Sequence, residues 1–72
     1  GVLNLDFEPI SGNTYGKYDV QILDLTGKVV FERAVQSGLN RMSPALSQGV
    51  YMLQLLGNGT EILRAEKLVI TK

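Results

Sequence analysis

The residue types that most often catalyse reactions or bind metals are scarce in this chain of 72 residues. It has no His and no Cys, which removes the usual general base near neutral pH, the thiolate nucleophile and the commonest metal ligands. Paired carboxylates can also transfer protons, but the Asp and Glu residues fall mostly on outward positions of the expected strands. The sequence therefore predicts a protein that is not an enzyme and has no metal or cofactor.

Two short motifs also point to turns rather than to chemistry. Gly27-Lys28 lacks the upstream Gly and the following helix of a phosphate-binding loop. Asn58-Gly59-Thr60 matches an N-glycosylation sequon, but Asn-Gly is also the preferred tip of a two-residue hairpin. We interpret both as hairpin turns, the first of them starting at Asp24.

Composition limits the partners. Lys plus Arg and Asp plus Glu both number 7, so the net charge is zero and the basic excess of a nucleic-acid-binding protein is absent. No apolar run approaches the roughly 20 residues of a membrane-spanning helix, so we expect no membrane insertion. A chain this short forms one domain, residues 1–72. Because it begins with Gly and has no signal peptide, we expect it to be a piece of a longer protein.

The elements that position these residues are strands. Apolar and polar residues alternate, and turn residues recur about every ten positions, over residues 2–8, 17–25, 28–35, 39–43, 49–56 and 60–71. The last segment is expected to break near Arg64-Ala65, and residues 45–48 to form one helical turn. Segment 49–56 is apolar on both faces and is expected to be the most buried strand, either central in a sheet or held between sheets. The pattern favours an antiparallel β-sandwich or small barrel of six to seven strands, for which Greek-key connectivity is plausible.

The final strand is the most informative segment for function. Its apolar run Leu68-Val69-Ile70 lies close to Lys72, the last residue, although most chain ends fray and need no apolar run. The run can close the sandwich, and it can also serve as a recognition tag, because an edge strand can be bound by main-chain pairing and by pockets for alternate side chains. Lys67 and Lys72 would discourage random pairing at that edge.

Four stretches, in this order and at this spacing, resemble one family over almost the whole chain. They are Val20–Val30 with its Asp-Leu-Thr-Gly-Lys turn, Gly38-Leu39-Asn40, Leu46–Tyr51 and Lys67–Lys72. Together they resemble the type A C-terminal sorting domain of the type IX (Por) secretion system of Bacteroidota. The Asn-Pro segment that usually opens such domains is absent, so an N-terminal opening segment, with a short first strand, is expected to be missing.

The resemblance implies a small immunoglobulin-like β-sandwich with no catalytic activity, at the C-terminus of a secreted protein. Such a domain passes through the periplasm and is recognised by the type IX outer-membrane translocon, which moves the upstream cargo to the surface or the medium. A sortase-like cysteine protease often removes the domain, and the cargo is attached to the cell surface.

The resemblance also assigns residues. Those expected to matter mainly for folding are Asp24, Gly27, Lys28, Gly49 and Tyr51. Those expected to be recognised by the translocon are Lys67, Leu68, Val69, Ile70 and Lys72. Two alternatives stay open. One is a carbohydrate-binding or adhesin-type module, which needs an exposed aromatic platform such as Tyr15. The other is a spacer β-sandwich of a secreted protein, whose chain should continue past Lys72.

Overall fold

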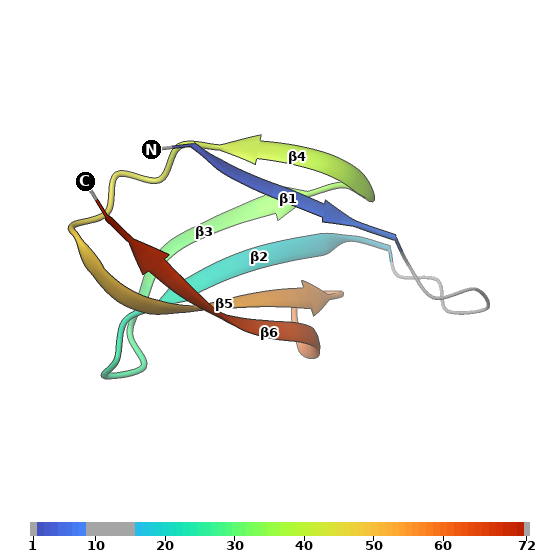
Figure 1. Cartoon of the computed structure of the whole chain (residues 1–72). Helices are drawn as coiled ribbons and strands as arrows, with labels where there is room; N and C mark the ends of the chain where they lie inside the picture. The colour runs from blue at the N-terminus through green and yellow to red at the C-terminus, as the bar shows by residue number, and fades with distance from the viewer. Residues whose placement is uncertain (1, 9–15, 72) are drawn as a thin grey trace.

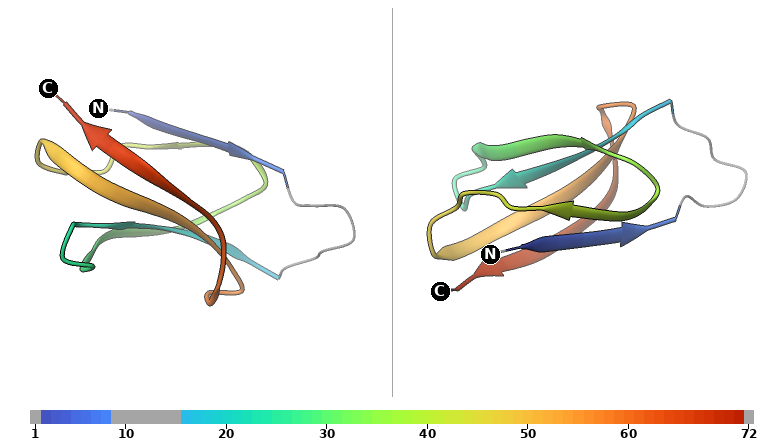
Figure 2. Two further views of the ribbon diagram at one scale, coloured as in Figure 1. Left: turned by 60° about the horizontal axis from the view of Figure 1, so that its bottom comes forward. Right: turned by 90° about the horizontal axis from the view of Figure 1, so that it is seen from above.

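The computed structural model describes residues 2–8 and 16–71, which form six β-strands and no helix. The strands are β1 (Leu3–Phe7), β2 (Tyr18–Leu23), β3 (Val29–Val35), β4 (Gly38–Met42), β5 (Gly49–Gly57) and β6 (Glu61–Ile70). Strands β1 and β4 pair in a two-stranded sheet, which packs on a four-stranded sheet of order β3-β2-β5-β6 (Figures 1 and 2). All neighbours are antiparallel. The expected immunoglobulin-like β-sandwich is confirmed, with six strands in the described residues.

The core lies between the two sheets because each strand turns every second side chain inward. In β2, Val20 and Ile22 are 0% exposed, whereas Gln21 between them is only half-buried. The residues that pack with these two in the buried core are Leu5, Phe7, Val35, Met42, Leu53 and Leu55. The ring of Phe7 meets that of Tyr18 edge-on, with centroids 5.1 Å apart, which joins β1 to β2 across the core.

Strand β5 is central, as its apolar pattern predicts, with β2 on one side and β6 on the other. It holds the run of buried residues at its C-terminal end. The two-stranded sheet covers one face of the larger sheet only, so Val50 and Met52 on the opposite face of β5 stay exposed. Of the two arrangements expected for this strand, the structure has the central strand of a sheet and not the strand held between sheets.

Two local expectations are wrong. Residues 45–48 form no helical turn; the Leu46 N–H instead donates to the Pro44 carbonyl at 3.0 Å, which closes a three-residue turn. Strand β6 is continuous through Arg64-Ala65. Its irregularity is a bulge one residue earlier, because Leu55 pairs with Arg64 while Leu56 pairs with Ile62, leaving Leu63 as the extra residue. From the sequence, Pro9 is expected to end the first strand and residues 11–13 to form a loop. Both lie outside the described residues.

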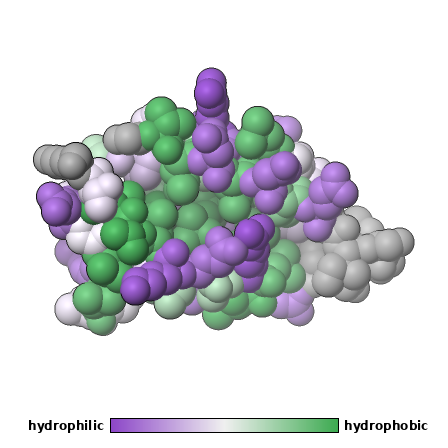
Figure 3. All heavy atoms as spheres, viewed as in Figure 1, coloured by the Kyte–Doolittle hydropathy of each residue, from purple (hydrophilic) through white to green (hydrophobic). Residues whose placement is uncertain are grey.

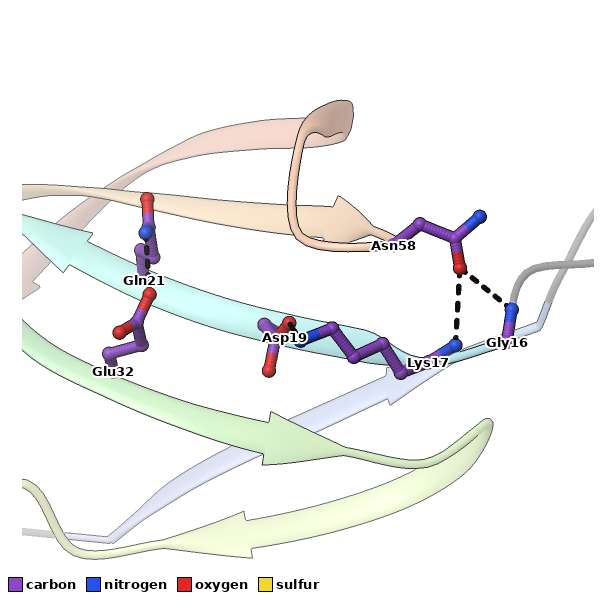
Figure 4. Close-up of polar contacts among 6 residues, drawn as sticks. All are labelled: Gly16, Lys17, Asp19, Gln21, Glu32 and Asn58. Carbon is purple, nitrogen blue, oxygen red and sulfur yellow. Dashed lines mark hydrogen bonds and ion pairs between the residues drawn. The ribbon is translucent and has the colours of Figure 1, made fainter.

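The hairpin tip between β5 and β6 is also hydrogen-bonded to Gly16 and Lys17, the residues just before β2. Three residues, 58–60, separate Gly57 from its partner Glu61. Asn58 and Gly59 have φ of 52° and 78°, the positive values of the two central residues of a type I′ turn, which the Thr60 N–H closes on the Gly57 carbonyl at 3.2 Å. The Asn58 side-chain oxygen accepts hydrogen bonds from the N–H groups of Gly16 at 2.8 Å and Lys17 at 3.4 Å (Figure 4). The pairing of β5 with β6 on either side of this turn confirms the hairpin interpretation. The Asn58 side chain adds hydrogen bonds from the tip to residues 16 and 17.

Candidate functional site

The segment 67–70 lies on the outermost strand of the larger sheet and is paired on one side only. Its partner is the start of β5, where Gly49 faces Ile70, Tyr51 faces Leu68 and Met52 faces Lys67. Two motifs that are separate in the sequence, the Gly-x-Tyr of β5 and the terminal segment, are therefore direct cross-strand neighbours. This pairing holds residues 67–70 in an ordered strand, so a partner protein would meet them in a fixed conformation.

Tyr51 holds the start of β5 in place. Its ring packs against the core, and its hydroxyl donates a 2.7 Å hydrogen bond to the Ser47 carbonyl, in the link that precedes β5. The ring lies over Gly49, since a Cβ added at Gly49 would meet it at 3.7–3.9 Å. That is ordinary van der Waals distance, so Ala would also fit at Gly49, and only a larger side chain would displace the Tyr51 ring. A displacement of the ring would reach the terminal segment through the pairing of β5 with β6.

The terminal segment presents two different faces. Leu68 packs against the core on the inner face and, like Ile70, is half-buried. Lys67 and Val69 point to the outer face, and Val69 is 53% exposed. Lys72 lies outside the described residues. Of the expected recognition residues, the exposed ones available to a partner are therefore Lys67 and Val69, while Leu68 serves the fold as well.

The turn from Asp24 to Lys28 is a self-contained structural unit. One carboxylate oxygen of Asp24 accepts from the Thr26 N–H at 2.9 Å, the Thr26 hydroxyl at 2.6 Å and the Lys28 N–H at 3.0 Å. The hydroxyl of Thr26, followed by the Lys28 N–H, holds the pKa of Asp24 below its ordinary value. Gly27 has φ of 89°, in the region that disfavours other residues. No hydrogen bond or ion pair of the described residues joins this turn to residues 67–71.

A hollow beside the terminal segment was not expected from the sequence. It has a volume of about 320 Å³ and is lined by Val2, Leu3, Pro44, Leu46 and residues 68–71. Figure 3 shows apolar side chains gathered in a recess on this side of the molecule, between β1 and β6, with polar side chains along the lower rim. Three segments distant in sequence form this hollow, so only their arrangement in the fold reveals it.

The rest of the described surface offers little chemistry. Within residues 2–8 and 16–71, no three Asp or Glu side chains come close enough to hold a metal ion. Some polar side chains are bound to one another within the larger sheet. Arg64 forms an ion pair with Glu66 at 2.7 Å, and the Gln21 amide donates to the Glu32 carboxylate at 2.6 Å. Figure 4 shows the contact between Gln21 and Glu32. The part of the chain that the structure describes includes no helix of the length and hydropathy needed to span a membrane.

Comparison with models of protein families gives a match. A family model described as a secretion system C-terminal sorting domain matches residues 1–71, nearly the whole chain. No curated protein matches the sequence, and no solved structure matches it.

Proposed function

This chain belongs to the family of secretion system C-terminal sorting domains, and from that premise we propose that residues 67–72 are the part that the type IX secretion machinery binds. The domain is a C-terminal sorting signal for type IX secretion, a system that exports cargo across the outer membrane to a secreted or surface location. The family is in general non-catalytic, so the domain acts by being recognised.

The observation that carries this proposal is the position of the terminal segment at a sheet edge. An edge strand has unpaired N–H and C=O groups along one side, which a partner strand can bind. In this edge strand Lys67 and Val69 are exposed, and no ion pair of the described residues involves Lys67. The segment therefore combines free backbone groups, an exposed apolar side chain and an available positive charge.

The same proposal includes the steps of export before and after the translocon binds the domain. The domain is one folding unit, residues 1–72, attached to an upstream cargo, and it crosses the periplasm with that cargo before the translocon binds it. A sortase-like cysteine protease then removes it, and the cargo is attached to the cell surface. Asp24, Gly27, Lys28, Gly49 and Tyr51 act before these steps, by keeping the sandwich folded. Their support is the hydrogen bonding of the turn and the packing at the start of β5.

The main alternative, a carbohydrate-binding module, finds no support in the described aromatic residues. Tyr18 and Tyr51 both pack against the core, and Phe31 does so as well. Tyr15, the residue expected to form a platform, lies outside the described residues. The family match favours the sorting signal over a spacer between domains.

A fusion experiment tests the proposal. A passenger protein with an N-terminal export signal is joined to this domain, with the family's opening segment restored, and expressed in a Bacteroidota host with a type IX system. We expect the passenger at the surface or in the medium, and we expect it in the periplasm when residues 68–72 are deleted. Protease resistance of the deleted fusion checks that the sandwich persists. Unchanged export of a folded deletion variant would refute the terminal segment's role.

A further inference from the structure

The hairpin tip Asn58-Gly59 carries the chemical groups of a spontaneous deamidation reaction. In that reaction the main-chain nitrogen of the residue after Asn attacks the carbonyl carbon of the Asn side chain, and a following Gly offers the least steric hindrance because it has no Cβ. Asn58 and Gly59 are both exposed to water. No hydrogen bond among the described residues uses the Gly59 N–H or the Asn58 side-chain nitrogen, and Figure 4 shows that nitrogen directed away from Gly16 and Lys17.

The folded turn keeps the two reacting groups apart. Asn58 has φ of 52° as the first central residue of a type I′ turn, where ψ is about +30°. With that ψ, the Gly59 nitrogen lies on the side of the Asn58 Cα opposite to its Cβ, and it cannot reach the carbonyl carbon of the side chain. The bond from the Thr60 N–H to the Gly57 carbonyl, at 3.2 Å, holds this conformation. The reaction therefore requires the turn to open.

Three more hydrogen bonds hold Asn58 itself. Its side-chain oxygen accepts from the Gly16 N–H at 2.8 Å and from the Lys17 N–H at 3.4 Å, and its own N–H donates to the Lys17 carbonyl at 3.0 Å. A rotation that brings the side chain to the Gly59 nitrogen must break these bonds. The rate of reaction in the folded domain is consequently limited by the small population in which the tip is open.

We propose that Asn58 is a latent modification site, which the folded hairpin protects and which is deamidated when the tip opens or the chain unfolds. The Gly59 nitrogen loses its proton and forms a bond to the Asn58 Cγ, the bond from Cγ to Nδ2 breaks, and ammonia leaves with the proton. Water then opens the succinimide ring at one of its two carbonyl groups, which gives aspartate or isoaspartate at position 58. The reaction uses only water, and it does not depend on the sorting function.

The two products have different effects on the fold. An aspartate at position 58 can still accept hydrogen bonds from the N–H groups of Gly16 and Lys17. It is also near the Lys17 ammonium group, which a Cβ added at Gly59 would meet at 3.8 Å. Isoaspartate leads the main chain through the side-chain carbons and lengthens it by one carbon, so the type I′ turn cannot re-form. A chain that stays unfolded long enough therefore loses its route back to this hairpin, and unfolding becomes irreversible.

Peptide mapping of the 72-residue chain by mass spectrometry tests the protection. The chain is incubated at mildly alkaline pH in a urea series that spans its unfolding, which circular dichroism follows. We expect Asn58 to react at least about tenfold more slowly in the folded chain than in the unfolded chain, and its rate to rise with the unfolded fraction. Asn40, which is followed by Arg41, is the internal control and should stay unmodified in both states.

Two results of the mapping would overturn the proposal. One is an equal rate at Asn58 in the folded and the unfolded chain, which would mean that the turn gives no protection. The other is equal conversion of Asn40 and Asn58 in the unfolded chain, which would mean that Gly59 has no special part in the reaction. Both results come from the wild-type chain, so they do not depend on the folding of a variant.

A refolding experiment tests the consequence for the fold. The wild-type chain is kept unfolded in urea at alkaline pH until much of Asn58 has reacted, and it is then diluted into refolding buffer. We expect the recovered native fraction to fall by the share of isoaspartate. Asn58→Asp, treated in the same way, is the matched control and should refold almost completely, because an ionised carboxylate is a poor target for the Gly59 nitrogen. Full recovery of native structure by the isoaspartate form would refute this account of irreversible unfolding.

Discussion

Tyr51 and Leu68 face each other across β5 and β6, and both pack against the same core. The Gly-x-Tyr motif and the terminal segment are consequently parts of one two-stranded unit. A deletion that removes Leu68 takes away a partner of Tyr51 as well as a candidate recognition residue. Recognition can therefore be separated from folding only at positions whose side chains point outward.

The hydroxyl of Tyr51 contributes to stability through its 2.7 Å hydrogen bond to the Ser47 carbonyl. We expect Tyr51→Phe to lower the free energy of unfolding by about 1 kcal/mol, a typical net value for one hydrogen bond. Urea denaturation followed by circular dichroism measures the change. Because the ring is kept, export of a fused passenger should stay within twofold of wild type, and a complete loss of export in a folded variant would show that the hydroxyl has another role.

Asp24 makes the stability of the domain dependent on pH. Its pKa is lowered in the folded state by the Thr26 hydroxyl and the Lys28 N–H. A lowered pKa stabilises the fold above the unfolded-state pKa of about 3.9, and this contribution is lost as the pH falls through the folded-state pKa. We expect unfolding free energies measured from pH 7 to pH 2.5 to fall less steeply for Asp24→Asn than for wild type. Parallel curves would contradict this assignment.

Two glycines should respond differently to the same substitution. Gly27 has φ of 89° and open space around it, so Gly27→Ala should cost about 1–2 kcal/mol through backbone strain alone. Gly49 has no positive φ, and an added Cβ would meet the Tyr51 ring at ordinary contact distance. Gly49→Ala should therefore change stability by less than about 0.5 kcal/mol. Thermal unfolding of the two variants compares them, and a larger loss at Gly49 would refute this account of the motif.

Burial predicts which of two isoleucines supports the fold. Ile22 is 0% exposed and Ile62 is 56% exposed. Ile22→Val should lower the unfolding free energy by about 1 kcal/mol, since it removes a fully buried methylene group, whereas Ile62→Val should have almost no effect. Urea denaturation of both variants gives the comparison. Equal effects would mean that the core does not lie between the two sheets as described.

Local patterns predicted the strands well, because alternation and turn residues are properties of neighbouring positions. Asp24 and Gly27 mark one hairpin and Asn58 another, and each turn contains the expected hydrogen bonds or positive φ. The apolar pattern of β5 left two arrangements open, and the structure has one of them, the central strand of a sheet. The bulge at Leu63 could not be placed, since it depends on the register between β5 and β6.

One local turn was predicted wrongly, and the features that depend on packing between distant segments were not predicted. The helical turn at 45–48 was wrong because Pro44 directs a tighter turn, with its carbonyl bonded to the Leu46 N–H. The hollow needs Val2 and Leu46 beside Leu68, an arrangement set by how the two sheets pack. The sequence identified the terminal segment as a candidate site, but it did not indicate that Gly49 and Tyr51 are its cross-strand partners.

We propose above that the secretion machinery binds the outer end of β6 on the folded sandwich. Val69 and Ile62 allow a matched test, since both lie on β6, opposite Val50 and Leu56 on the same face, and are 53% and 56% exposed. The measurement is the exported fraction of a passenger that carries Val69→Asn or Ile62→Asn in the fused domain. We expect the exported fraction to fall about fivefold for Val69→Asn and less than about twofold for Ile62→Asn, at similar thermal stability. Equal export of the two variants would contradict the proposal.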